Sequence, residues 1–248
     1  MNKIKAAVIG LGNSGIKLDL DGARKEIWTH SVAIQKHKNL NLLATVDKIE
    51  CKKELFEKLG ISSETIFYKD INEMIKEINP EFVSICTPAG SHLDIVKKIT
   101  KGSNLKYIFC EKPVGISVKE TEEIITICKN KKVILGTNYM RRWEDKYINI
   151  KEKILNKEYG NLLAINANGA TALYTSASHL IDLMIYFSGQ VSEVSGILQT
   201  NYIREVHGHK DFGANAFLKF KSGVTGHLKA VSKSPKFYMF EVDLLFEE

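Results

Sequence analysis

The chain has 248 residues, 44% of them hydrophobic and 26% charged, a composition typical of a soluble globular protein and a length that suits two domains. Its 35 basic and 29 acidic residues leave a net charge of +6, spread along the chain without a basic stripe, which argues against nucleic-acid binding. Its four cysteines lack metal-ligand spacing, and the sequence has neither a leader nor a long apolar run. We therefore expect free thiols, no metal, no membrane span and a cytoplasmic location.

The N-terminal fifteen residues contain a glycine-rich turn. Residues 3–9 form an apolar strand pattern, and the turn follows as Gly10-Leu11-Gly12-Asn13-Ser14-Gly15. Glycines allow the backbone to approach a pyrophosphate, whose charge is stabilised by free N–H groups and the dipole of a following helix. The pattern therefore predicts a strand that turns directly onto a helix N-terminus.

An acidic residue ends the second predicted strand. Residues 40–46 form an apolar strand that ends at Asp47, and residues 17–28 look like an insertion before a helix over 29–38 that Thr29 would cap. A carboxylate here would accept hydrogen bonds from both adenosine ribose hydroxyls and would repel a 2′-phosphate, which favours NAD over NADP. The neighbouring Lys48 keeps NADP possible as the cofactor. The alternative interpretation of Asp47 is a solvated carboxylate in a loop.

The rest of the first half alternates helices and strands. Helices are expected over residues 50–59, 70–78, 93–101 and 117–129, and strands over 66–68, 82–86, 107–110 and 133–136. Two of the strands run into Thr87-Pro88 and Glu111-Lys112-Pro113, at ends where open α/β sheets bind ligands. This alternation predicts an α/β, doubly wound parallel sheet.

After residue 138 the pattern changes. Helices are expected over 143–155 and 178–187, and strands over 162–168, 191–202, 214–220, 224–231 and 237–246, with a hairpin turn at Lys221-Ser222-Gly223. Successive strands without helices indicate an α+β domain with a mostly antiparallel sheet. The predicted domains are therefore residues 1–138 and 139–248.

These features follow the order found in the Gfo/Idh/MocA oxidoreductases, which the chain resembles over almost its whole length. The specific part of the resemblance is the Glu-Lys-Pro tripeptide after a buried strand, combined with the downstream Ser-His-Leu-Ile-Asp helix of residues 178–182. The resemblance implies a Rossmann domain, a C-terminal sheet domain, and hydride transfer between NAD(H) and a carbinol of a sugar, cyclitol or nucleotide sugar.

The resemblance also implies which residues contact ligands. Cofactor contacts are expected from Gly10, Gly12, Asn13, Ser14, Gly15, Asp47, Lys48, Thr87, Pro88, His92, Glu111, Lys112 and Asn138. Substrate contacts are expected from Lys112, Tyr139, Arg142, Thr175, His179 and Asp182. His92 is expected to start a helix near the cofactor without acting in catalysis.

Lys112 and His179 are the expected catalytic residues. Hydride transfer from a carbinol needs a base for the hydroxyl proton and a cation for the developing alkoxide. A lysine whose pKa is lowered by burial can supply both, and a histidine near neutrality can relay the proton. The alternative interpretation of Lys112 is a surface lysine, and that of His179 is a histidine packed in the core. His207, His209 and Asp211 resemble a metal cluster only by composition, and a sheet-edge loop is the preferred interpretation.

Two features depart from the family pattern. Many members carry a carboxylate four residues before the helix histidine, where this chain has Thr175, whose hydroxyl is no base at neutral pH. The chain also stops at Glu248, before the further strands of family members, which would leave an unfilled sheet edge. We therefore keep open a shortened, non-catalytic NAD-binding protein with a regulatory or scaffold role, and expect a homo-oligomer formed through the C-terminal sheet.

Overall fold

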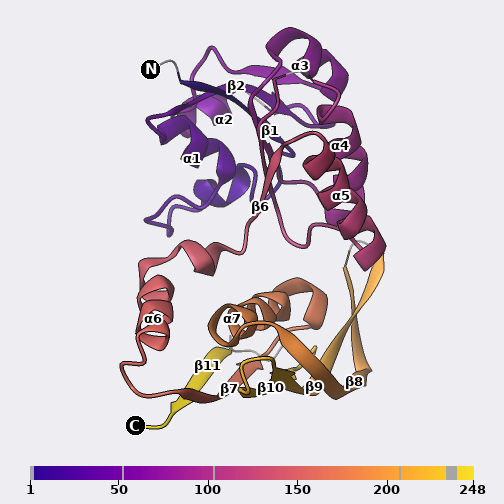
Figure 1. Ribbon diagram of the computed structural model, residues 1–248. Helices are drawn as coiled ribbons and strands as arrows, with labels where there is room; N and C mark the ends of the chain where they lie inside the picture. The colour runs from indigo at the N-terminus through magenta and orange to yellow at the C-terminus, as the bar shows by residue number, and fades with distance from the viewer. Residues whose placement is uncertain (1–2, 52, 103, 207, 233–238) are drawn as a thin grey trace. The chain divides into compact units, whose positions relative to one another are not determined.

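The structure is a computed structural model that describes residues 3–51, 53–102, 104–206, 208–232 and 239–248. The chain forms two units, Met1–Asn138 (unit 1) and Tyr139–Glu248 (unit 2), which are described separately (Figure 1). Every helix among the described residues is too short or too polar to cross a membrane. The assignment of a cofactor role to unit 1 and a substrate role to unit 2 stays a prediction.

Unit 1 contains a six-stranded parallel sheet in the order β3-β2-β1-β4-β5-β6. The strands are β1 (Ile4–Ile9), β2 (Leu40–Val46), β3 (Ile66–Tyr68), β4 (Phe82–Ile85), β5 (Tyr107–Cys110) and β6 (Ile134–Thr137). The helices are α1 (His30–Lys36), α2 (Lys53–Lys58), α3 (Ile71–Ile78), α4 (His92–Ile99) and α5 (Val118–Asn130). The predicted doubly wound sheet is confirmed. The strand order reverses between β1 and β4, which is where such sheets bind ligands.

The centre of this sheet is buried on both faces, as its apolar strand sequences predict. Residues 6–8 of β1 are completely buried, and two hydrophobic clusters pack on opposite sides of the strands. Ser117 caps α5 as predicted, because its Oγ accepts a hydrogen bond from the N–H of Glu120 at 3.2 Å. The sheet therefore offers a rigid base for the loops at its carboxyl edge.

The segment after the glycine turn differs from the prediction. The turn does not open α1; it continues into a four-residue 3₁₀-helix, η1 (Lys17–Leu20), and α1 begins only at His30. The inserted segment returns to its starting point, since the N–H of His30 donates to the carbonyl of Ser14 at 2.9 Å. Thr29 precedes α1 as expected, but its hydroxyl donates to Asp19 at 2.5 Å instead of capping the helix.

Unit 2 contains a five-stranded mixed sheet in the order β11-β7-β10-β9-β8. Its strands are β7 (Leu162–Gly169), β8 (Val191–Val206), β9 (His209–Phe220), β10 (Thr225–Ala230) and β11 (Phe240–Phe246). Its helices are α6 (Asp145–Leu155) and α7 (Ser178–Ser188), with a 3₁₀-helix, η3 (Met140–Trp143), and a π-helical turn, η4 (Leu173–Ala177). Among the described strands of this sheet, only β10 and β7 pair in parallel, so the predicted mostly antiparallel sheet is confirmed.

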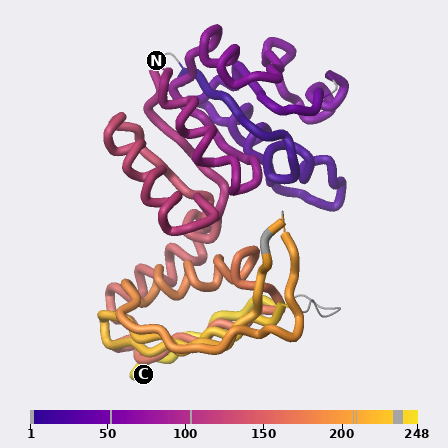
Figure 2. Tube along the Cα trace, turned by 90° about the vertical axis from the view of Figure 1, so that its right-hand side faces the viewer, coloured from indigo at the N-terminus to yellow at the C-terminus, as the bar shows by residue number. Residues whose placement is uncertain are grey.

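One face of this sheet packs against α7. Leu180, Leu183 and Met184 of the helix are completely buried, together with apolar side chains of β7, β9 and β10. Figures 1 and 2 show α7 lying across the sheet and the outer part of the β8–β9 hairpin extending away from it. Both strands are longer than predicted, because residues 204–206 pair with residues 209–211 beyond a register shift.

Candidate functional site

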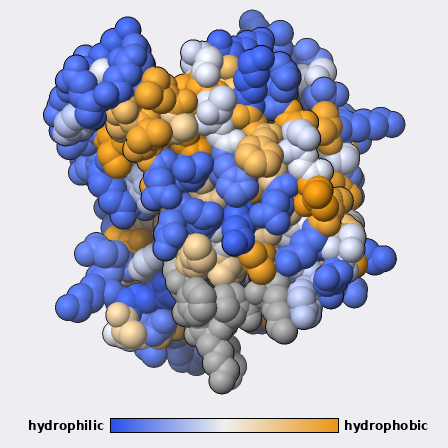
Figure 3. Space-filling model, turned by 90° about the horizontal axis from the view of Figure 1, so that it is seen from below, coloured by the Kyte–Doolittle hydropathy of each residue, from blue (hydrophilic) through white to orange (hydrophobic). Residues whose placement is uncertain are grey.

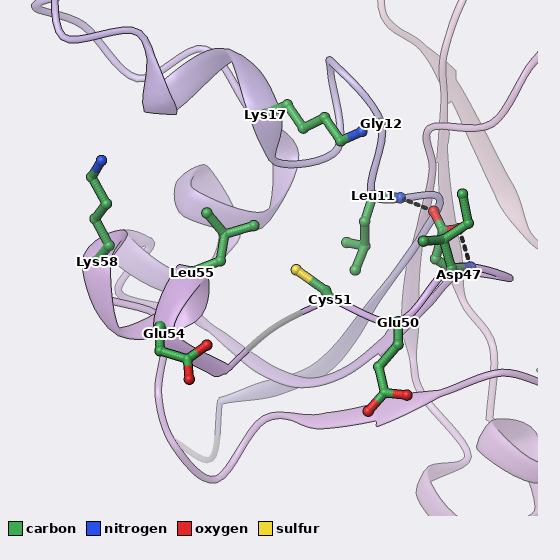
Figure 4. Close-up of a pocket in the computed structure, with 10 residues that line it drawn as sticks. Leu11, Gly12, Lys17, Asp47, Glu50, Cys51, Glu54, Leu55 and Lys58 are labelled. Carbon is green, nitrogen blue, oxygen red and sulfur yellow. Dashed lines mark hydrogen bonds between the residues drawn. The ribbon is translucent and has the colours of Figure 1, made fainter.

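A cavity of about 590 Å³ opens beside the glycine turn of unit 1. It lies beyond the carboxyl ends of β1 and β2, between the turn, η1 and α2 (Figure 4). Its lining consists of Leu11, Gly12, Lys17, Asp47, Ile49, Glu50, Cys51, Glu54, Leu55 and Lys58. Apolar walls with a few charged groups at the edge suit a flat, partly polar ligand such as a nucleoside.

The glycines of the turn are required by its geometry. Gly10 has a φ of +94°, and a Cβ there would come within 2.8 Å of the Thr87 side chain. A Cβ on Gly15 would come within 2.0 Å of the carbonyl oxygen of Gly10, whereas a Cβ on Gly12 would meet nothing. The turn is therefore tightly closed against β4 and open at Gly12, the glycine that lines the cavity.

The turn also presents hydrogen-bond donors. Among the described residues, the N–H groups of residues 12–15 have no acceptor, whereas those of Ile16 and Lys17 donate to the carbonyl of Gly12 at 3.0 Å. A run of free backbone N–H groups is a typical anion-binding arrangement. These donors fit the diphosphate of a dinucleotide.

Asp47 is held in place by backbone donors on both sides. Its Oδ2 accepts a hydrogen bond from the N–H of Leu11 at 2.6 Å, and its Oδ1 accepts one from the N–H of Ile49 at 3.0 Å. Each carboxylate oxygen keeps capacity for a further donor, as ribose hydroxyls would need. Lys48 is exposed and lies outside the described cavity lining, whereas Asp47 is part of it.

The turn after β4 is supported from behind by His92. This histidine is completely buried; its Nε2 lies 2.8 Å from the carbonyl oxygen of Thr87, and its Nδ1 lies 3.0 Å from that of Val114. Ser91 donates to the hydroxyl of Thr87 at 2.8 Å, and Pro88 precedes a short 3₁₀-helix. His92 therefore holds the Thr87-Pro88 turn in place and offers no side-chain surface to a ligand.

A buried polar network that the sequence analysis missed lies beneath the Glu-Lys-Pro segment. His30 contacts Ser84 through Nδ1 at 2.5 Å and Glu111 through Nε2 at 3.0 Å. Asn138 donates to the same Glu111 oxygen at 2.9 Å. The carboxylate of Glu111 also accepts the N–H of Lys112 at 3.3 Å. Glu111 and Asn138 thus link the ends of β5 and β6 to His30, and their expected contacts with the cofactor stay a prediction.

The network holds a charged pair. Burial lowers the pKa of His30, but hydrogen bonds to Cys86 and Glu111 outweigh burial and raise the pKa to about 10. Burial alone would raise the pKa of Glu111, yet the hydrogen bonds from His30 and Asn138 lower it. Both pKa shifts favour the charged forms, an imidazolium at His30 and a carboxylate at Glu111.

Lys112 lies directly after this network. Its side chain is half-buried, and the bond to Pro113 is cis. The segment is fixed by Glu111 on one side and by the carbonyl of Val114, which faces His92, on the other. The ammonium is thus carried by a rigid segment at a strand end.

In unit 2, the predicted substrate residues form two contacts. Arg142 binds Asp182 through Nε at 2.9 Å and Nη2 at 2.9 Å, a bidentate ion pair. The ring of Tyr139 meets that of His179 edge-on, with the centroids 5.8 Å apart. Burial and the Asp182 carboxylate raise the pKa of Tyr139. The structure therefore gathers Tyr139, Arg142, His179 and Asp182 around the start of α7.

Thr175 lies on the π-helical turn that precedes α7. Its N–H donates to the carboxylate of Asp211 at 3.1 Å, and the N–H of Tyr174 donates to the other oxygen of Asp211 at 2.7 Å. Asp211 is 1% exposed, so it acts as a buried anchor for this turn. His207 lies outside the described residues. The sequence analysis grouped Asp211 with the histidines by composition and did not predict this role. Thr175, which Asp211 anchors, lies 36 residues away in the sequence.

Comparison with known proteins places this geometry in a family. Residues 4–139 match an oxidoreductase family's NAD-binding Rossmann fold, and residues 149–247 match the GFO/IDH/MocA C-terminal domain. The chain is similar to the myo-inositol 2-dehydrogenase of Thermotoga maritima, with 28% identity over 158 residues, 63% of this chain and 42% of that protein. It is 25% identical to the scyllo-inositol 2-dehydrogenase (NAD(+)) of Bacillus subtilis over 253 residues, 94% of this chain and 69% of that protein.

Solved structures share the fold. The WlbA dehydrogenase of Chromobacterium violaceum, solved with NADH and UDP-GlcNAcA, aligns with a TM-score of 0.78 at 17% identity, over 100% of this chain and 72% of that one. The matches to the curated inositol dehydrogenases of Thermotoga and Salmonella cover about half of those proteins, 42% and 53%.

The two family matches cover nearly all of both units, and the first is to an NAD-binding domain. The glycine turn, its free donors and Asp47 fit that cofactor. The chain belongs to the Gfo/Idh/MocA oxidoreductase family.

Proposed function

We propose that the chain is a dehydrogenase that uses NAD(H) to oxidise a carbinol, or reduce the matching carbonyl, of a sugar, cyclitol or nucleotide sugar. The observation that carries the cofactor choice is Asp47, fixed by two backbone donors at the mouth of the cavity. Its negative charge accepts hydroxyl donors and repels a phosphate. The dehydrogenases that resemble the chain act on inositols by name, and WlbA is paired with a nucleotide sugar.

The proposed chemistry assigns a proton and a hydride to different groups. A bound nicotinamide would supply the acceptor for the hydride that the carbinol carbon loses with both electrons of its C–H bond. The amine of Lys112 takes the hydroxyl proton, so that one carbinol becomes one carbonyl for each NAD⁺ reduced. Lys112 in its ammonium form stabilises the alkoxide in the reverse direction. His179 is the proposed second proton carrier.

The remaining residues of unit 2 are proposed to orient the substrate. The guanidinium of Arg142 is held by Asp182, which leaves part of its donor set for substrate hydroxyls. Tyr139 stacks edge-on against His179 and so limits how that imidazole can rotate. Thr175 contributes a hydroxyl where a carboxylate is common in the family.

Replacing Lys112 by Met tests the assignment. The change removes the proton acceptor and the cation but keeps the length of the side chain, so we expect kcat to fall about a thousandfold. The affinity for NAD⁺ should stay within a few-fold. NADH absorbance with a panel of inositols, sugars and nucleotide sugars measures the first quantity, and calorimetric titration measures the second.

Lys119→Met is the matched control, because it removes an equal charge from an exposed position on α5. It should leave both quantities unchanged. Turnover by Lys112→Met within tenfold of the unmodified protein would refute the role of Lys112.

A second candidate is a protein that binds NAD without turnover. Thr175 favours it, since a hydroxyl is no base at neutral pH and its segment is anchored to Asp211. This candidate predicts NAD⁺ binding by titration together with no NADH formation for any member of the same panel. Production of NADH with one member would exclude it.

A further inference from the structure

The inserted segment changes what stabilises charge at the glycine turn. In a Rossmann turn the following helix contributes a partial positive charge at its N-terminus. Here only the four residues of η1 follow the turn, and α1 begins at His30. So short a helix aligns few peptide dipoles, and its contribution is well below that of a long helix. The free N–H groups of residues 12–15 remain, but they lack the usual support.

The insertion places a lysine beside the glycine turn. Lys17 is the first residue of η1 and lines the cavity together with Gly12. In Figure 4 its side chain extends toward Gly12, from the side of the turn on which the cavity opens. Its side chain is exposed, and among the described residues its ammonium takes part in no hydrogen bond or ion pair. An unpaired ammonium beside a run of free N–H groups has the charge and the reach to bind a phosphate.

We propose that Lys17 supplies the positive charge that holds the diphosphate of the bound dinucleotide, in place of the helix that the insertion displaces. This inference rests on the proposed use of NAD. It adds Lys17 to the cofactor site, a residue that the glycine pattern alone did not identify.

The position of the acidic groups decides which phosphate Lys17 binds. Asp47, Glu50 and Glu54 line the part of the cavity formed by the end of β2 and by α2. In Figure 4 the carboxylates of Glu50 and Glu54 point away from the glycine turn. A 2′-phosphate on the adenosine ribose would face Asp47, which repels it, whereas the diphosphate would face the turn and Lys17. Lys17 is therefore assigned to the diphosphate.

The test separates phosphate recognition from adenosine recognition. Calorimetric titration of ADP-ribose and of adenosine is carried out on the unmodified chain and on Lys17→Met, Lys17→Arg and Lys25→Met. Lys25 is the matched control, since it is exposed in the same inserted segment and outside the cavity lining. We expect Lys17→Met to raise the Kd of ADP-ribose about tenfold and that of adenosine less than about twofold. Lys17→Arg should restore most of the affinity, and Lys25→Met should change neither value.

Salt dependence gives a second readout. Binding of ADP-ribose to the unmodified chain should weaken with rising salt more steeply than binding to Lys17→Met, because one ion pair is missing from the variant. An unchanged melting temperature shows that the variant is folded.

Two results would overturn the inference. They are equal affinity of Lys17→Met and the unmodified chain for ADP-ribose, or an equal loss of affinity for adenosine. A different result, in which the unmodified chain binds neither ADP-ribose nor NAD⁺, would refute the proposed function itself.

Discussion

At the scale of single residues, His30 ties together three parts of unit 1. It contacts Ser84 in β4 and Glu111 after β5, and Asn138 after β6 shares the same carboxylate. Its side chain is 7% exposed, so the imidazolium is compensated by Glu111 in a region that excludes water. Removing one partner of a buried pair leaves the other charge uncompensated.

His30→Gln should therefore destabilise unit 1 by about 3 kcal/mol near neutral pH. The pKa of His30 is raised from 6.5 to about 10 in the folded protein. Its contribution to stability is fully present below the ordinary pKa and is lost as pH rises through the raised one. The difference in free energy of unfolding between His30→Gln and the unmodified chain should therefore shrink between about pH 7 and pH 10, as urea unfolding would show. A difference that is independent of pH would contradict a charged His30.

The residues that the sequence predicts to be in the site differ from those it does not predict in the signal they leave in the sequence. Asp47 and Lys112 each follow a strand, so the rule that ligands bind at carboxyl ends points to them directly. His30 and Glu111 are 81 residues apart, and a pairing between distant segments leaves no periodic or local pattern. Lys17 lies in an insertion, where no rule of spacing applies.

At the scale of elements, the inserted segment of residues 17–28 is closed at its base by Asp19. Its Oδ1 accepts the N–H of Trp28 at 2.7 Å, and its Oδ2 accepts both the N–H and the hydroxyl of Thr29. The excess length was visible in the sequence, because the second strand came late. The displacement of α1 was not, since apolar spacing does not show where a returning loop reconnects.

Asp19→Ala should loosen this segment without unfolding unit 1. The amides of Trp28 and Thr29 lose their acceptor, so we expect them to exchange hydrogen about tenfold faster or more, as mass spectrometry of exchanged peptides would show. Glu26→Ala removes an equal charge from an exposed position in the same segment and serves as the control. Unchanged exchange in Asp19→Ala would show that Asp19 does not close the loop.

At the scale of the whole molecule, the class of each unit followed from the order of elements. Alternation of helices and strands predicted the parallel sheet of unit 1, and consecutive strands predicted the sheet of unit 2. The parallel pairing of β10 with β7 was not foreseen, since strand order within a mixed sheet depends on packing between distant segments. The strand lengths of β8 and β9 were underestimated, because their outer parts lack an apolar pattern.

Among the described residues of unit 2, the helices leave one face of the sheet uncovered. Apolar Ile197, Phe217 and Leu245 are 78%, 69% and 60% exposed, among polar neighbours such as Asn215. Figure 3 views this side and shows apolar side chains interspersed with polar ones. Ile197 pairs with Asn215 across β8 and β9, and Ser195 pairs with Phe217, so these positions share one face of the sheet.

We expect this face to bind a second copy of the chain. Burial of large exposed apolar side chains is favourable, whereas carboxylates placed there would stay unpaired inside an interface. The double variant Ile197→Asp, Phe217→Asp should therefore shift the chain to a monomer, as light scattering across a dilution series would show. Val118→Asp is the control, because Val118 is equally exposed, at 76%, but lies at the start of α5 in unit 1. A double variant that still associates would assign association to another surface, and an unmodified chain that is monomeric at every concentration would refute association through this face.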